Sequence, residues 1–133
     1  MGDLSPHFST SELCCHDCGR CSVSGRLLAA LEELRAMGPE PIVVDDGYRC
    51  PEHNASVGGV QDSQHILGTA ADIRILGLSV QAMYDRAKQV PEFAAGGIGV
   101  YDTGFIHVDV RDGKARWSRV RGVYLGLDQL VTV

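Results

Sequence analysis

Apolar residues recur at helical spacing in two stretches of the chain, each followed by a helix breaker. The first helix is predicted to begin after Ser24, which can cap it, and to stop at Gly38-Pro39. The second is predicted over Ser79 to Val90, immediately before a proline. Their apolar faces consist of Leu27, Leu28, Leu31 and Leu34 in the first helix and of Val80, Met83, Tyr84 and Ala87 in the second. The capping-box pattern of Ser9 to Glu12 predicts one further short helical turn.

Shorter apolar runs, separated by polar and glycine-containing segments, predict strands. They are Pro41 to Val44, Thr69 to Ile75, Gly97 to Val100, Phe105 to Val110 and, as an edge strand, Ala115 to Ser118. Asp102-Thr103-Gly104 separates the third run from the fourth and predicts a hairpin. The polar stretch from Cys50 to Gly68 is predicted to be a loop with one helical turn after Pro51, and no element is predicted for the tail from Val120.

Together these elements predict a small α+β domain over residues 1–133, with helices packed on one side of a mainly antiparallel sheet. A length of 133 residues fits one domain with a single core, and 44% hydrophobic and 22% charged residues is an ordinary balance for such a domain. No apolar run approaches the roughly 20 residues of a membrane span. The net charge of −5 argues against a nucleic-acid partner, because phosphate binding needs a basic face.

The cysteines are concentrated near the start of the chain, at positions 14, 15, 18 and 21, with one more at position 50. In a chain without an evident export signal, such crowding is more typical of metal binding or reduced thiols than of disulfides. Cys15, Cys18 and Cys21 have ligand-like spacing, and Cys50 or His16 could complete a structural metal site. A disulfide, for example between Cys50 and the cluster, and free thiols are the alternatives, and the pattern does not separate them.

Two histidines and one aspartate form a candidate catalytic metal site. His65, Asp72 and His107 are a donor set that suits Zn²⁺ and leaves a fourth position for water. Zinc lowers the pKa of a bound water towards about 7 and polarises a bound carbonyl group. A single histidine is more often a core residue or a turn cap than a ligand, so the assignment depends on the motifs around these three residues.

Those motifs occupy four stretches of the chain. They are Asp46 to Asn54, Val57 to Gly59, Ser63 to Asp72 and Phe105 to Asp109. Together they resemble the zinc D-alanyl-D-alanine carboxypeptidase family of bacterial cell-wall metallopeptidases, whose S-x-H-x-x-G-x-A-x-D motif is matched without a gap by Ser63 to Asp72. The resemblance extends roughly from Phe8 to Trp117. It implies the fold that this family shares with the hedgehog signalling domain and with vancomycin-resistance D,D-dipeptidases.

The resemblance also implies roles for individual residues. His65, Asp72 and His107 match the family's zinc ligands, and Arg49 matches the arginine of its G-Y-R motif, which binds substrate and stabilises the developing oxyanion. This role suits a fixed guanidinium, which can offer two donors to a carbonyl or carboxylate group, although a surface salt bridge would also account for Arg49. Ser63 is expected either to hydrogen-bond substrate or to cap the turn before His65.

The chain departs from the family at the general base. Many members carry a catalytic acid three residues before the last zinc histidine, and here that place is Gly104. Asp109 is the first alternative, because positions 107 and 109 of a strand point to the same face. It could take a proton from the zinc-bound water or orient His107 as an outer carboxylate. Asp102, in the preceding turn, is the second alternative.

We therefore expect a zinc-dependent D,D-carboxypeptidase or endopeptidase that hydrolyses peptidoglycan stem peptides. The alternatives are a non-catalytic zinc module that binds cell-wall peptide or a protein partner, and a structural module organised by the cysteines. The first seven residues show no secretory signal, so synthesis in the cytoplasm is expected. We further expect a monomer, phage-encoded and released to the cell wall, or exported by another route.

Overall fold

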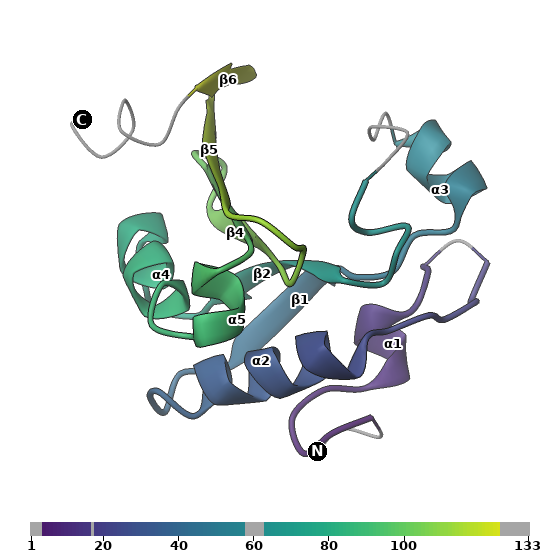
Figure 1. Ribbon diagram of the computed structural model, residues 1–133, viewed down its shortest axis with the longest axis horizontal. Helices are drawn as coiled ribbons and strands as arrows, with labels where there is room; N and C mark the ends of the chain where they lie inside the picture. The colour runs from purple at the N-terminus through teal and green to yellow at the C-terminus, as the bar shows by residue number, and fades with distance from the viewer. Residues whose placement is uncertain (1–3, 17, 58–62, 126–133) are drawn as a thin grey trace.

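Six strands form one sheet in a computed structural model that describes residues 4–16, 18–57 and 63–125 (Figure 1). Their order across the sheet is β1-β2-β4-β3-β5-β6. Their bounds are Ile42–Asp46 for β1, Ala70–Ile75 for β2, Gly97–Tyr101 for β3, Phe105–Asp109 for β4, Ala115–Val120 for β5 and Val123–Leu125 for β6. All neighbouring pairs are antiparallel except β3 and β5, which are parallel. The expected α+β class with a mainly antiparallel sheet is confirmed.

Five helices accompany the sheet in the described part of the chain. They are α1 (Thr10–Leu13), α2 (Gly25–Arg35), α3 (Pro51–Ser56), α4 (Val80–Ala87) and α5 (Pro91–Ala94). The side chains of Ser24, as predicted, and of Ser79 cap α2 and α4 by accepting backbone N–H bonds. Helices α2, α4 and α5 gather on one side of the sheet, and α3 lies apart from them on the segment after β1 (Figure 1). None of the described helices combines the length and apolar character needed to cross a membrane.

The two faces of the sheet differ in chemistry because side chains alternate along each strand. On the helix-covered face, Ile73 of β2 is the direct partner of Ile106 of β4, and Ala71 is the partner of Val108. These four residues are fully buried in the core, together with the leucine stripe of α2 and with Met83 and Ala87 of α4. The intervening positions, Asp72 and His107, therefore point to the opposite face, where polar side chains can meet a ligand.

A β-bulge near the end of β1 changes which face Asp46 occupies. Val44 belongs to the core and pairs with Ile73, so simple alternation would send Asp46 into the core as well. The register shifts between these two positions, and Asp46 becomes the partner of Asp72. Bulges re-aim side chains in this way. As a result, Asp46 shares a face with Asp72.

The C-terminal region and the segment after α4 differ from the sequence-based expectation. Ala115 to Ser118 was expected as an edge strand, and in the described residues Ala115 to Trp117 pair with β3 alone, but β5 continues to Val120 and its part from Ser118 onward also pairs with β6. The two strands are joined by Arg121 and Gly122, which both have positive φ (53° and 79°), as a two-residue hairpin turn requires. Helix α4 ends at Ala87, earlier than the expected Val90, and Pro91 opens α5 because its fixed φ suits the first helical position.

Gly68 lies where no side chain fits. Its substitution by alanine therefore tests the close packing of this turn. It has a φ of +74°, and an added Cβ would lie 1.6 Å from the Ser22 carbonyl oxygen, whereas Gly77 has a φ of +88° with open space around it. Gly77→Ala is expected to cost about 1–2 kcal/mol of unfolding free energy through backbone strain alone. Gly68→Ala adds overpacking, about 1–3 kcal/mol more.

Urea denaturation of both variants in the presence of a chelator measures this difference without a contribution from metal binding. Equal losses for the two variants would contradict the close approach of residue 68 to residue 22.

Candidate metal centre

A row of directly paired residues crosses the polar face of the sheet and brings two of the predicted ligands together. Asp72 of β2 is the partner of His107 of β4, with Asp46 of β1 on one side of this pair and Gly99 of β3 on the other. Side chains of direct partners project from the same face with their Cβ atoms about 5 Å apart. The pairing of β2 with β4 therefore places an imidazole beside a carboxylate across 35 residues of sequence.

His65 reaches the same place from a tight turn before β2. Within this turn the N–H of Gly68 donates to the carbonyl of His65. The His65 ring is buried, and its Nδ1 lies 2.7 Å from the carbonyl oxygen of Gly47, to which it must donate because a carbonyl can only accept. Nε2 is therefore left without a proton in the neutral ring, and it lies 3.2 Å from Asp72 Oδ1.

His107 is oriented in the same manner by a different partner. Its Nε2 lies 2.7 Å from Asp109 Oδ2, to which it donates, and its Nδ1 lies 3.1 Å from Asp72 Oδ1. Two nitrogen lone pairs and one carboxylate oxygen thus converge, with one ligand atom from each of the three residues within 4.8 Å of the others. Acceptors that converge without a proton between them need a cation. This donor set fits a zinc ion with an open coordination position.

The electrostatics of the metal-free site lead to the same conclusion. Burial by itself would raise the pKa of the Asp72 carboxyl group, but when a proton occupies the facing nitrogens of His107 and His65, their hydrogen bonds outweigh burial and hold that pKa well below its ordinary value. Burial would lower the pKa of His107, but hydrogen bonds to Asp109 and Asp72 raise it. The site therefore stabilises a negative carboxylate next to positive charge, whether that charge is a proton or a metal ion.

Asp109 is fully buried and both of its oxygens are occupied. Oδ1 accepts the backbone N–H groups of Gly97 and Arg111, and Oδ2 accepts His107 Nε2 and the Arg111 guanidinium. Burial would raise the pKa of this carboxyl group, but the bonds from His107 and Arg111 lower it overall. The sequence suggested two roles for Asp109, proton transfer and orientation of His107. This arrangement fits the second role.

Arg49 lies at the end of the row, next to β1. Its Nε donates to Asp46 Oδ2, its NH1 donates to Asn54 Oδ1 at 3.0 Å, and its NH2 lies 3.5 Å from Asp72 Oδ2. The side chain is only 13% exposed, so these contacts fix the guanidinium next to the ligand set instead of leaving it on the surface. The alternative of a surface salt bridge does not describe this residue.

Asp46 is a site residue that the sequence did not single out. Its Oδ2 holds Arg49, whereas its Oδ1 is buried and, within the described residues, is the one buried side-chain oxygen or nitrogen without a hydrogen-bond partner. A buried unpaired oxygen costs about 1–3 kcal/mol and usually has a functional reason. The signal in the sequence was the pair of aspartates that ends the β1 run, but only the bulge shows that one of them faces the site.

Trp117 of β5 is a second residue that sequence reasoning missed. Its ring centroid lies 5.0 Å from that of His107, and its Nε1 donates to the Tyr101 hydroxyl group at 3.1 Å. It can lie over β3 because Gly99 has no side chain, and a Cβ there would come within 2.3 Å of the indole. Gly97 makes room for Asp109 in the same way. Glycines two residues apart on one strand face were the available signal.

The remaining sequence candidates have structural partners. Ser63 is buried and its hydroxyl group accepts the backbone N–H of His65, which is the capping role. Asp102 is exposed in the turn after β3 and accepts the N–H of Arg121. Gly104 closes that turn by donating to the Tyr101 carbonyl with a φ of +109°, a conformation that a glutamate or aspartate rarely adopts. The place of the family's usual acid is therefore part of the hairpin turn.

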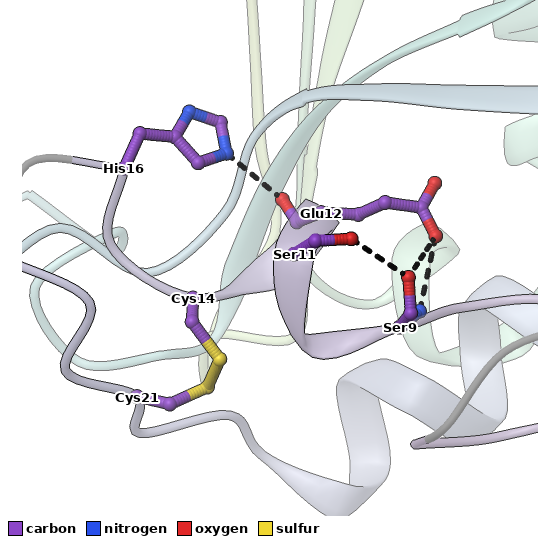
Figure 2. The surroundings of a disulfide bond; sticks show 6 residues. All are labelled: Ser9, Ser11, Glu12, Cys14, His16 and Cys21. Carbon is purple, nitrogen blue, oxygen red and sulfur yellow. Dashed lines mark hydrogen bonds between the residues drawn. A yellow bond between two sulfur atoms is a disulfide. The ribbon is translucent and has the colours of Figure 1, made fainter.

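The cysteines divide into two groups, which corrects the set proposed from spacing. Cys21 is bonded to Cys14 in a disulfide beside α1, so it is not available as a ligand, and the ring of His16 lies against the Glu12 carbonyl (Figure 2). Cys15, Cys18 and Cys50 are not in a disulfide. Arg20 donates to Cys18 Sγ at 3.2 Å and lowers the pKa of that exposed thiol to about 7.

Comparison with known proteins gives two matches. A family model described as peptidase M15 matches residues 6–109. A stretch of 44 residues is 47% identical to the protein named zinc D-Ala-D-Ala carboxypeptidase from Streptomyces albus G. That stretch covers 32% of this chain and 17% of the Streptomyces protein, so the match extends over less than a fifth of that relative.

Proposed function

The chain belongs to the peptidase M15 family, and from this premise we propose that it is a zinc-dependent peptidase of peptidoglycan stem peptides, acting as a D,D-carboxypeptidase or endopeptidase. The observation that carries the proposal is the convergence of His65 Nε2, Asp72 Oδ1 and His107 Nδ1 on the polar face of the sheet. The similarity to the Streptomyces zinc D-Ala-D-Ala carboxypeptidase supports the substrate class.

Zinc is the proposed cofactor, with His65, Asp72 and His107 as its ligands. When bound there, it would supply an acidified water and an electrophile for the scissile carbonyl group. The protein's own residues prepare this position. Gly47 and Asp109 each accept the proton on the outer nitrogen of one imidazole, so both rings present their free nitrogen to Asp72. Such outer partners typically contribute about 10- to 100-fold in metal affinity or activity.

Arg49 is proposed to bind the substrate. Asp46 and Asn54 accept hydrogen bonds from Nε and NH1 of its guanidinium, and NH2 lies next to the Asp72 carboxylate. A guanidinium fixed in this way can donate to a substrate carbonyl or terminal carboxylate group without reorganising, and one such preorganised donor contributes about 10²- to 10³-fold to turnover. Ser63 supports this site indirectly by capping the turn that carries His65.

Asp46 is proposed to transfer the proton during catalysis. It would replace the catalytic acid that many family members carry at the position of Gly104. Its Oδ1 is unpaired, its Oδ2 is fixed by Arg49, and its strand position is directly opposite Asp72. By contrast, the oxygens of Asp109 already accept hydrogen bonds from His107, Gly97 and Arg111. We therefore assign proton transfer to Asp46 Oδ1 and the orientation of His107 to Asp109.

The function is tested by incubating the protein with a muropeptide that ends in D-Ala-D-Ala, beside its diastereomer that ends in L-Ala-L-Ala. Zinc-loaded protein is expected to release D-alanine from the first substrate only, and chelation followed by zinc addition is expected to abolish and then restore the release. A cross-linked muropeptide dimer measures the endopeptidase activity in parallel. Stoichiometric zinc binding without cleavage of any of these substrates would contradict the peptidase and favour the non-catalytic zinc module.

A further inference from the structure

Three cysteines that are not in a disulfide, from two distant segments, meet outside the His/Asp site. Cys15 and Cys18 lie in the loop after α1, and Cys50 lies between β1 and α3. Their sulfur atoms are all within 4.8 Å of one another, and the sulfur atoms of Cys15 and Cys50 are 3.6 Å apart. Cys15 and Cys50 are buried, whereas Cys18 is exposed. No step of the proposed peptidase mechanism uses these residues.

The loop that carries Cys15 and Cys18 is closed on itself in the way that a two-cysteine ligand loop requires. The N–H of Cys15 donates to the Arg20 carbonyl at 2.8 Å, and the N–H of Gly19 donates to the Cys15 carbonyl at 2.9 Å. Gly19 follows Cys18 directly and has a φ of +74°, which turns the chain back. The Cys14–Cys21 disulfide joins the two ends of this loop (Figure 2). The loop is therefore constrained covalently at its base and by hydrogen bonds above it.

The sulfur separations suit a tetrahedral ion. Thiolates at the Zn–S distance of about 2.3 Å are roughly 3.8 Å apart along the edge of a tetrahedron. The 3.6 Å between Cys15 and Cys50 is close to this value and far from the roughly 2.05 Å of a disulfide. Cys15 and Cys18 also form a Cys-x-x-Cys pair, and such pairs are frequent zinc ligands.

The charges around the thiols suit an anionic metal–thiolate centre. Three thiolates and one divalent cation leave one net negative charge. The Arg20 guanidinium lies against it, donating from Nε to Cys18 Sγ at 3.2 Å while its NH2 pairs with Glu52 at 3.1 Å. An adjacent cation favours the thiolate form, which is the form that binds metal.

We propose that Cys15, Cys18 and Cys50 bind a second zinc ion, separate from the ion of the His/Asp site, with the fourth position open to solvent beside Cys18. This ion would join the N-terminal segment to the segment that carries Arg49, because Cys50 is the residue after Arg49. The same two segments already meet where the N–H of Tyr48 donates to the Leu13 carbonyl at 2.7 Å. The proposal does not depend on the peptidase activity.

The test is a metal count on the full chain, purified with its thiols protected from oxidation. Wild type is expected to bind two zinc ions, His65→Ala one, Cys18→Ser one and the double variant none. The paired substitutions Cys14→Ser and Cys21→Ser remove two cysteines that are not ligands, together with the disulfide at the base of the loop, and this variant is expected to retain both ions at saturating zinc, with a weaker affinity at the cysteine site. Cys18 is the preferred ligand to change because its side chain is exposed, so its loss should not disturb the core.

Cobalt substitution of the wild-type protein gives a readout that needs no variant. Thiolate ligands produce an intense sulfur-to-cobalt charge-transfer absorption, which the His/Asp site cannot produce. We expect this absorption in wild type and in His65→Ala, and its loss or marked weakening in Cys18→Ser. A single zinc ion in wild type with no such absorption would overturn the proposal, as would a Cys15–Cys50 disulfide found by mass spectrometry in protein purified under reducing conditions. Neither result would bear on the peptidase, which is assayed separately.

Discussion

His65→Ala is expected to remove the zinc ion of the His/Asp site and to reduce turnover to the level of the chelated protein. The imidazole contributes one of three ligand nitrogens and oxygens, and its Nε2 is aimed at Asp72 Oδ1. Losing a ligand must cost more than losing an outer partner, which by itself costs about 10- to 100-fold. The measurement is zinc content together with the rate of D-alanine release at saturating zinc.

His7→Ala is the matched control for this variant. Like His65, His7 has a ring nitrogen close to a carboxylate, with its Nδ1 2.6 Å from Glu32 Oε1. It lies on the surface, away from the polar face of the sheet. It should retain zinc and turnover. Circular dichroism and urea denaturation with chelator would establish that His65→Ala is folded. A folded His65→Ala protein that keeps wild-type activity would contradict the ligand assignment.

Asp46→Asn is expected to lower kcat by on the order of 10²- to 10⁴-fold, the range for loss of a general acid–base group. Asparagine retains an acceptor for Arg49 Nε but cannot take a proton, so the change in kcat should exceed the change in KM. If Asp46 served only to hold Arg49, the weakened guanidinium contact would instead appear mainly in KM. Steady-state kinetics on the D-Ala-D-Ala peptide separate these two outcomes.

Two neighbouring aspartates provide the comparison. Asp45→Asn removes an exposed ion pair with Arg74 and should leave both constants unchanged. Asp109→Asn should act through the orientation of His107. We expect it to lower activity by about 10- to 100-fold, and we expect excess zinc to restore part of that activity. If Asp109→Asn lost kcat irrespective of zinc while Asp46→Asn remained active, proton transfer would belong to Asp109.

Much of the fold could be predicted because its signals are local. Ser24 caps its helix as the sequence indicated, and Ile73, Ile106 and Val108 occupy the core face that their alternation requires. Strand β6 was not predicted, because a run of three apolar residues is too short to show alternation and its pairing with β5 depends on the turn at Arg121. The parallel pairing of β3 with β5 likewise depends on contacts between segments distant in sequence.

The sequence predicted the site residues that belong to recognisable motifs. It did not predict the residues that enter the site through strand register. His65, Asp72 and His107 were identified from their motifs, and the structure brings all three together. Asp46 and Trp117 enter the site only through the bulge in β1 and through the missing side chain at Gly99. For the cysteines, spacing could not distinguish Cys21, which is in a disulfide, from Cys18, which is free.

The division of the sheet into an apolar and a polar face has an evolutionary consequence. Because odd and even positions of β2 and β4 serve different faces, substitutions at Asp72 or His107 leave the packing of Ile73 and Ile106 untouched. Descendants of such a chain can therefore exchange catalysis for ligand binding by point mutation while the scaffold persists. A single inserted or deleted residue within either strand would instead interchange the two faces, so length changes in this lineage should be confined to the connecting segments.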